Sequence, residues 1–202
     1  MPAKRRTAED ARQALRAAAL ELFVADGYGA TSLEDIASRL GVTRQAVLYH
    51  FKTKEELLRS VVDPYLESVR RVLDQLAVSD PPTHDDRRDT LAALVDVWAD
   101  HRGVVALLSR FTTESTIAGL GPQLVELRIR VRTLLGGSDL DADPALRTRV
   151  QAAAAALAGV LAARTEIPLD TPEERGVLVD AALAMFASDG ETSSSSGGPK
   201  RT

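Results

Sequence analysis

Apolar residues recur at intervals of three and four along most of the chain, which is the pattern of amphipathic helices. The first such segment covers about residues 7–26 and places Leu15, Ala19, Leu22 and Phe23 on one face. The strict alternation that is typical of strands occurs nowhere over a useful length. The pattern therefore predicts an all-α chain of about nine helices.

Residues 31–58 carry the densest helix signals in the chain. Ser32 and Asp35 form a variant capping box that starts one short helix, and Gly41 can supply the left-handed residue that ends it. Thr43 then caps a second short helix. Two short helices joined by a tight turn are typical of a helix-turn-helix, whose second helix meets base edges with its N-terminal end. This segment predicts DNA binding.

Six further helices are predicted after residue 52. Thr53 and Glu56 form a capping box that opens a long helix, which Pro64 is expected to kink or break near residues 61–63. A linker at 79–86 follows, then helices at about 86–101, 103–118, 121–136, 144–164 and 172–188, the last with Thr171 as its cap and Pro172 in its first turn. We expect a DNA-binding domain at 1–52, a ligand-binding and dimerisation domain at 53–188 and a disordered tail at 189–202.

Composition and charge support this division. The chain is 45% hydrophobic but only 4% aromatic, which favours close-packed helices, and the absence of cysteine excludes disulfides and thiolate metal sites. Residues 1–59 hold ten Lys and Arg against eight Asp and Glu, whereas residues 60–202 hold fifteen against twenty-one. A slightly basic head on an acidic body fits DNA binding at one end. Neither a signal sequence nor an apolar run of membrane-spanning length is found, so we expect a soluble cytoplasmic protein that is not associated with a membrane.

Candidate DNA contacts gather on the second short helix. Arg44 can pair with guanine and Gln45 with adenine, each good pair discriminating by roughly 1–3 kcal/mol, although both could be solvated helix-start residues. Tyr49 and Lys54 are candidates for phosphate contacts, and the basic arm at residues 4–6 for the minor groove. A lone histidine such as His50 is more often packed between helices than functional. The full predicted set is Lys4, Arg5, Arg6, Ser32, Thr43, Arg44, Gln45, Ala46, Tyr49, His50 and Lys54.

These signals agree in order and spacing with a known family. The residues that carry the agreement are Gly27-Tyr28, Thr31-Ser32, Ile36-Ala37, Gly41-Val42-Thr43, Tyr49-His50-Phe51, Lys54 and Leu57. Over about residues 7–58 the chain resembles the TetR family of bacterial transcriptional regulators. The resemblance implies a ligand-responsive homodimer, usually a repressor, that binds a near-palindromic operator and is released by a small molecule. Leu48 stands where the family commonly has an aromatic residue, which leaves the phosphate contact to Tyr49.

The body carries two further sets of candidates. Polar and aromatic residues on its central helices could line an effector pocket, although Trp98 and Phe111 would equally serve as ordinary core and Arg128 as a solvated residue. The pocket candidates are Trp98, His101, Arg102, Phe111, Glu114 and Arg128. The last two helices carry broad apolar surfaces with small residues, which resemble the family's dimerisation pair or could pack within one chain. The predicted dimer interface is Val150, Ala154, Leu157, Leu161, Leu178, Ala181, Ala182 and Met185.

Two other classes of function remain as alternatives. His84, Asp85 and Asp86, or Asp96 with His101, could form a metal-dependent catalytic site, but no nucleophile–base set, phosphate loop or HExxH motif accompanies them. We therefore predict no catalytic residue, no metal and no cofactor. The other alternative is an adaptor with a degenerate head that does not bind DNA. Only Leu48 favours it, whereas the basic arm and Lys54 argue against it.

Overall fold

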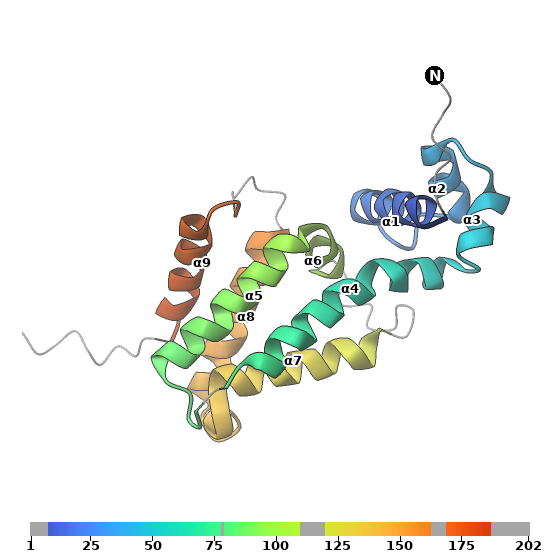
Figure 1. Ribbon diagram of the computed structural model, residues 1–202. Coiled ribbons are helices and arrows are strands. Elements are labelled where there is room, and N and C mark those ends of the chain that lie inside the picture. The colour runs from blue at the N-terminus through green and yellow to red at the C-terminus, as the bar shows by residue number, and fades with distance from the viewer. Residues whose placement is uncertain (1–7, 78, 110–119, 163–168, 187–202) are drawn as a thin grey trace, which may run out of the picture.

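The computed structural model describes residues 8–77, 79–109, 120–162 and 169–186. Across these ranges the secondary structure consists of nine α-helices and one short 3-10 helix, without a strand. Figure 1 shows an elongated molecule with a small helical head at one end and a larger helical body at the other. The predicted all-α architecture is confirmed.

The head consists of α1 (Ala8–Ala25), α2 (Leu33–Leu40) and α3 (Arg44–His50). Phe23, Ile36, Val47 and Phe51 are fully buried and join the three helices in one core. The predicted caps are confirmed: Ser32 and Asp35 form a capping box at α2, and Thr43 Oγ1 accepts a hydrogen bond from the Ala46 N–H at α3. Gly41 has φ +65°, the left-handed conformation that lets the chain turn sharply between α2 and α3.

The helix α4 (Lys54–Gln75) runs from the head into the body, as Figure 1 shows. Of the kink or break expected near residues 61–63, the break is wrong, because α4 continues through Pro64. Proline removes only one helical hydrogen bond here, and buried Val61, Val62 and Leu66 hold the helix on both sides of it.

The predicted capping box at the start of α4 is only half formed. Thr53 Oγ1 accepts from the Glu56 N–H at 3.1 Å. Glu56 Oε2, however, accepts from the backbone N–H of Lys52 at 2.7 Å, one residue before the expected donor. The start of α4 is thus capped by both side chains in a different arrangement.

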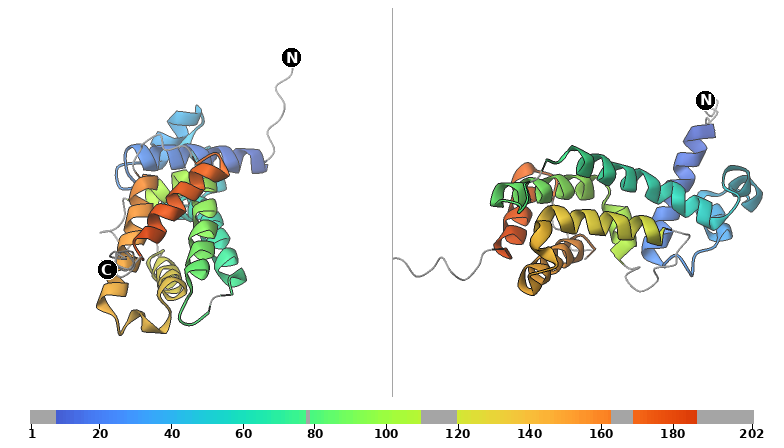
Figure 2. Two further views of the ribbon diagram at one scale, coloured as in Figure 1. Left: turned by 90° about the vertical axis from the view of Figure 1, so that its left-hand side faces the viewer. Right: turned by 90° about the horizontal axis from the view of Figure 1, so that it is seen from below.

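The body contains α5 (His84–Asp100), α6 (Arg102–Ser109), α7 (Gly121–Gly136), η2 (Gly137–Leu140), α8 (Pro144–Ala162) and α9 (Pro172–Ala184). One core extends from the head along α4 to α5, α6 and α7. A second core joins α5, α7, α8 and α9, and Trp98 and Val131 pack against both. Figure 2 shows the same arrangement from two further directions. Because the first core contains residues of both, the head is joined to the body by packed side chains.

Two boundaries in the body differ from the prediction. The helix α5 starts at His84, inside the expected linker at 79–86, because Thr83 and Asp86 form a capping box that the sequence reading missed. The helix α6 is described as far as Ser109, so residues 110–118 of the predicted helix lie outside the described ranges. Residues 187–202, which include the whole predicted tail, also lie outside them.

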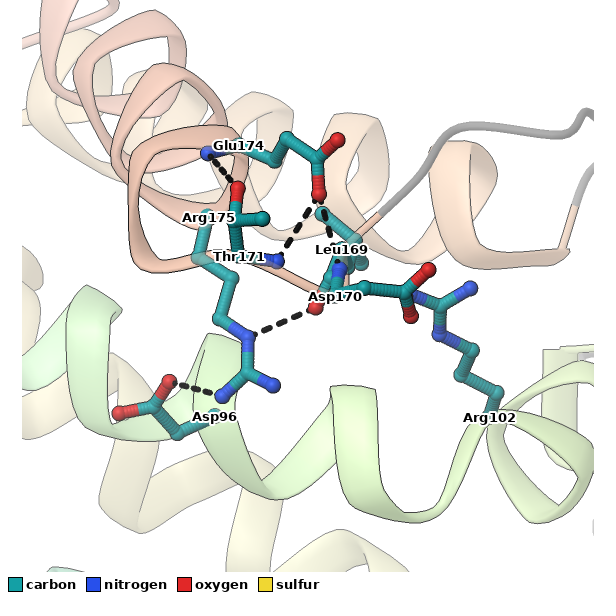
Figure 3. Close-up of polar contacts among 7 residues, drawn as sticks. All are labelled: Asp96, Arg102, Leu169, Asp170, Thr171, Glu174 and Arg175. Atoms are coloured by element: carbon teal, nitrogen blue, oxygen red, sulfur yellow. Dashed lines mark hydrogen bonds and ion pairs between the residues drawn. The ribbon is translucent and has the colours of Figure 1, made fainter.

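Polar contacts attach α9 to α5, as drawn in Figure 3. Arg175 donates from Nε to the Leu169 carbonyl and from Nη1 to Asp96 Oδ1, both at 2.8 Å. The predicted cap is confirmed, since Thr171 and Glu174 form a capping box at the start of α9. These contacts fix the register of α9 against α5.

Candidate nucleic-acid interface

The N-terminal turn of α3 is the most exposed part of the head that carries base-reading residue types. Arg44, Gln45 and Ala46 are exposed, whereas Val47, the next residue, is fully buried. The buried valine holds the helix against α1 and α2 while the preceding turn projects into solvent. This is the geometry by which a recognition helix enters a major groove.

Tyr49 lies further along α3 and is 75% exposed, an unusual position for a large aromatic side chain. Its ring meets that of half-buried His50 edge-to-face, with centroids 5.1 Å apart. An exposed phenol on the side of a recognition helix can donate its hydroxyl to a phosphate. Leu48 is half-buried and contributes no polar group.

Lys54 forms hydrogen bonds and a ring contact within the head that the sequence did not indicate. Its ammonium donates to the carbonyls of Tyr28 and Thr31, both at 2.9 Å, and lies 4.3 Å from the centroid of the Tyr28 ring. Tyr28 in turn donates its hydroxyl to Glu55 at 3.2 Å. Burial, followed by the charge of Glu55, raises the pKa of Tyr28 to about 12. Lys54 therefore joins α4 to the turn between α1 and α2, and its predicted phosphate contact is left with one N–H.

Arg12 is a further structural residue of the interface, and the sequence reading missed it. Its Nη1 donates to the carbonyl of His50 at 2.9 Å, and its guanidinium lies 4.5 Å from the centroid of the Phe51 ring. The contact places a cation at the C-terminal end of α3, where the helix has free carbonyls and negative partial charge. No local motif could have marked it, since donor and acceptor are 38 residues apart.

The remaining predicted DNA contacts have simpler positions. Ser32 is exposed and its hydroxyl serves the cap of α2. Thr43 is exposed at the start of α3, beside Arg44. The arm residues Lys4, Arg5 and Arg6 lie outside the described ranges. All of these DNA contacts remain predictions.

Four of the six predicted effector residues lie in the described ranges. Trp98 packs between the two cores. His101 Nε2 contacts Ser68 Oγ at 3.2 Å, and Arg102 pairs with Asp170 at 3.4 Å on the surface. Arg128 is exposed on α7, and Phe111 and Glu114 lie outside the described ranges.

The predicted dimer residues divide into two groups. Val150, Leu157 and Ala182 are buried in the core between α5, α7, α8 and α9, so they serve the single chain rather than a partner. This corrects their assignment, because a broad apolar surface on a helix does not show whether the same chain or a partner covers it. Ala181 is exposed, and Ala154, Leu178 and Met185 are half-buried; the side chain of Leu161 is outside the description.

Comparison with known proteins places this head in a family. The sequence profile described as "Bacterial regulatory proteins, tetR family" matches residues 15–61, from α1 to the first part of α4. The HTH-type transcriptional regulator SrpR of Pseudomonas putida is 49% identical over 55 residues, which cover 27% of this chain and 26% of SrpR. The HTH-type transcriptional activator FasR of Mycolicibacterium smegmatis is 34% identical over 96 residues, 46% of this chain and 40% of FasR.

The solved structure of SCO3833, a TetR-family member from Streptomyces coelicolor, superposes with a TM-score of 0.69 over 85% of this chain and 88% of that one, at 24% identity. The chain has a TetR-family head at residues 15–61. Its alignment with these curated TetR-family relatives spans well under half of their length, so what their bodies bind does not extend to this chain. The structural likeness shows that the body also has the TetR-family fold.

No group of three or more His, Cys, Asp or Glu side chains capable of holding a metal ion is found among the described residues. None of the described helices is long and apolar enough to cross a membrane. The related proteins named above are transcription regulators.

Proposed function

We propose that the protein is a ligand-responsive transcription regulator that binds a near-palindromic DNA operator as a homodimer. The observation that carries this proposal is the exposed first turn of α3, with Arg44 and Gln45 projecting beside the anchored Val47. A head built in this way can pair side chains with base edges while its backbone stays fixed. Repression follows where the operator overlaps a promoter.

The homodimer rests on the outer faces of α8 and α9. Val177 is 70% exposed, and the small residues Ala152, Ala155 and Ala181 are exposed on the same two helices. Small side chains permit close approach of helices, and a two-fold axis would pack α8 and α9 against their copies. Two heads would then reach half-sites about 34–36 Å apart, one turn of DNA.

The effector response rests on α4, which belongs to the core that extends from the head into the body. We divide the chain into a DNA-binding domain at residues 1–52 and a ligand-binding and dimerisation domain at 53–188. A small molecule bound in the body can move the heads only by as much as its affinity differs between the two arrangements. The continuous helix α4 would carry such a movement directly to the head.

The experiment that tests DNA binding is a selection from random duplexes with the full-length protein, followed by a salt titration on the selected site. We expect a two-fold symmetric sequence and an affinity that falls steeply with salt. Arg44→Ala/Gln45→Ala should abolish the preference for that sequence. The control is Arg71→Ala/Gln75→Ala, the same residue types exposed on α4, which should leave it unchanged. Enrichment of no sequence by the folded protein would overturn the proposal.

The homodimer is tested separately by sedimentation. Val177→Asp places a charge at the centre of the proposed interface and should shift the protein to monomer. The control Val125→Asp changes an exposed valine of α7, outside that interface, and should leave the dimer intact. A native protein that sediments as a monomer at all concentrations would contradict the dimer while leaving DNA binding by single heads to be measured.

A further inference from the structure

Lys52 lies between the recognition helix and α4, on the surface of the head. It is exposed and belongs to neither helix, since α3 ends at His50 and α4 begins at Lys54. The set of DNA contacts predicted from the sequence includes Lys54 and omits Lys52. The two lysines differ in what their ammonium groups contact, and this difference decides which of them is available to a ligand.

The ammonium of Lys54 is committed to the fold. It donates to two backbone carbonyls, both at 2.9 Å, and lies over the ring of Tyr28. Lys54 as a whole is half-buried. An ammonium has three N–H donors, so a phosphate would have only one of them to bind. A phosphate contact from Lys54 would also have to draw the cation away from the aromatic ring.

The ammonium of Lys52 has a single contact within the described residues. It donates to the Leu48 carbonyl at 3.2 Å, which is at the long end of the range for such hydrogen bonds. Two of its three N–H groups are therefore available. The backbone N–H of Lys52 donates to Glu56 Oε2 at 2.7 Å, which fixes the main chain from which the side chain projects. The attachment of the side chain is held in place while its charged end can bind a partner.

The charge of Lys52 is not neutralised by a carboxylate. Three cations of residues 8–59 are exposed: Arg39, Arg44 and Lys52. Arg39 pairs with Glu21 at 2.8 Å, whereas Arg44 and Lys52 form no ion pair with a described residue. Arg44 is the first residue of α3, and Lys52 follows the last residue of α3 by two positions. The unpaired positive charges of this surface therefore lie at the two ends of the recognition helix.

The length of α3 suits contacts at both of its ends. Its seven residues span about 10 Å at a rise of 1.5 Å per residue, close to the roughly 12 Å width of the major groove. When the N-terminal end of a recognition helix meets base edges, its C-terminal end lies nearer the sugar–phosphate backbone. Tyr49, which is 75% exposed, belongs to the same end. A cation at this end meets phosphates and not bases.

We propose that Lys52 contacts a DNA phosphate at the C-terminal end of α3, and that Lys54 serves the fold instead. The ammonium of Lys52 would donate its two available N–H groups to phosphate oxygens, a charge-assisted contact. Such a contact carries no base preference, so Lys52 positions the recognition helix while Arg44 and Gln45 read the sequence. This inference rests on the proposed function, because it names a further residue of the same DNA-binding site.

The competing role for Lys52 is structural. A lysine near the C-terminal end of a helix can stabilise the carbonyls there, and the contact with Leu48 is of this kind. A purely structural role would change the stability of the protein and leave the salt dependence of DNA binding as it is. The two roles are therefore separated by measuring both quantities on the same variants.

The test measures affinity for the selected operator over a range of salt concentrations, with full-length native, Lys52→Met and Lys52→Arg proteins. We expect Lys52→Met to reduce the steepness of log affinity against log salt by about one for each bound head, and to weaken operator and unrelated duplexes by similar factors. Lys52→Arg keeps the charge and should restore the native slope. The control is Arg71→Met, which removes an exposed charge of α4 that forms no ion pair with the described residues. It should leave the slope unchanged.

Urea unfolding of the same variants measures the structural role. We expect Lys52→Met to leave the urea midpoint nearly unchanged, because the side chain is exposed and its one hydrogen bond is long. A lower midpoint together with a native salt slope would assign Lys52 to the helix end and overturn the proposal.

An unchanged slope for Lys52→Met would overturn the inference whatever the urea midpoint. A slope reduced by Lys54→Met instead would return the phosphate contact to Lys54. Both results leave the proposed function intact, since the native protein still binds its operator. A folded native protein that binds no duplex would contradict the proposed function together with this inference.

Discussion

Arg12 donates a hydrogen bond from Nη1 to the backbone carbonyl of His50 at 2.9 Å, which joins α1 to the C-terminal end of the recognition helix. The same guanidinium lies over the ring of Phe51, the residue that ends α3. One side chain thus satisfies a helix-end carbonyl and covers a buried aromatic ring. The orientation of α3 in the head depends on this contact as well as on Val47.

We expect Arg12→Met to lower the free energy of unfolding by about 1–3 kcal/mol, because it removes a charged hydrogen-bond donor and a cation–π contact. Urea unfolding followed by circular dichroism measures the change. Arg39→Met is the control, since Arg39 pairs with Glu21 on an exposed surface and should matter by less than about 1 kcal/mol. Equal effects of the two substitutions would contradict the proposed role of Arg12.

Lys54 allows a sharp choice between a structural and a DNA-contacting role. With two donors on the carbonyls of Tyr28 and Thr31, Lys54→Met should destabilise the protein by about 1–3 kcal/mol. The slope of log affinity for the operator against log salt should stay the same, because a lost phosphate contact would reduce it by about one. A reduced slope with unchanged stability would instead support the phosphate contact predicted from the sequence.

The sequence predicted local features well because their determinants are local. Ser32, Gly41, Thr43 and Thr171 act within a few residues of their own positions, and each has the predicted cap or turn. Arg12 and Lys54 could not be found in this way, because their partners lie 23 to 38 residues away.

What covers each face of a helix was harder to predict than the helix itself. The helical pattern of α8 correctly indicated that Val150 and Leu157 are buried, but it could not say whether a partner or the same chain covers them. In a helix packed on two sides, both faces are apolar and the period no longer distinguishes them. Pro64 is a different case, in which the local signal was misleading. Proline usually ends a helix, but α4 continues through it because its buried neighbours hold the helix in place.

Asp86 should make stability depend on pH in the acid range. Hydrogen bonds from the Ser79 hydroxyl, and then from the Thr83 backbone and side chain, lower the pKa of Asp86 from its ordinary 3.8 to about 2. The unfolded chain binds this proton more readily, so the contribution is full above about pH 4 and is lost as the pH falls toward 2. Asp86→Asn should flatten the dependence of the urea midpoint on pH in that window, whereas Asp89→Asn should not. Identical slopes for native protein and Asp86→Asn would contradict this.

Two buried threonines offer a matched test of hydrogen bonding in the core. Thr90 is fully buried on α5, and its hydroxyl has no partner among the described residues. Thr31 is 3% exposed, but its hydroxyl donates to the Gly27 carbonyl at 2.9 Å. Valine has nearly the same shape as threonine without the hydroxyl, so the two substitutions isolate the polar group.

Thr90→Val should stabilise the protein by about 1 kcal/mol, because it removes the cost of an unpaired buried hydroxyl. For a chain of this size that corresponds to a rise in Tm of roughly 2–4 °C. Thr31→Val should lower stability by about 1 kcal/mol, since it leaves the Gly27 carbonyl with one donor fewer. Thermal unfolding of both variants measures the pair of changes. If Thr90→Val destabilised the protein as much as Thr31→Val, the Thr90 hydroxyl would have a partner in solution, and a bound water would be the first to seek.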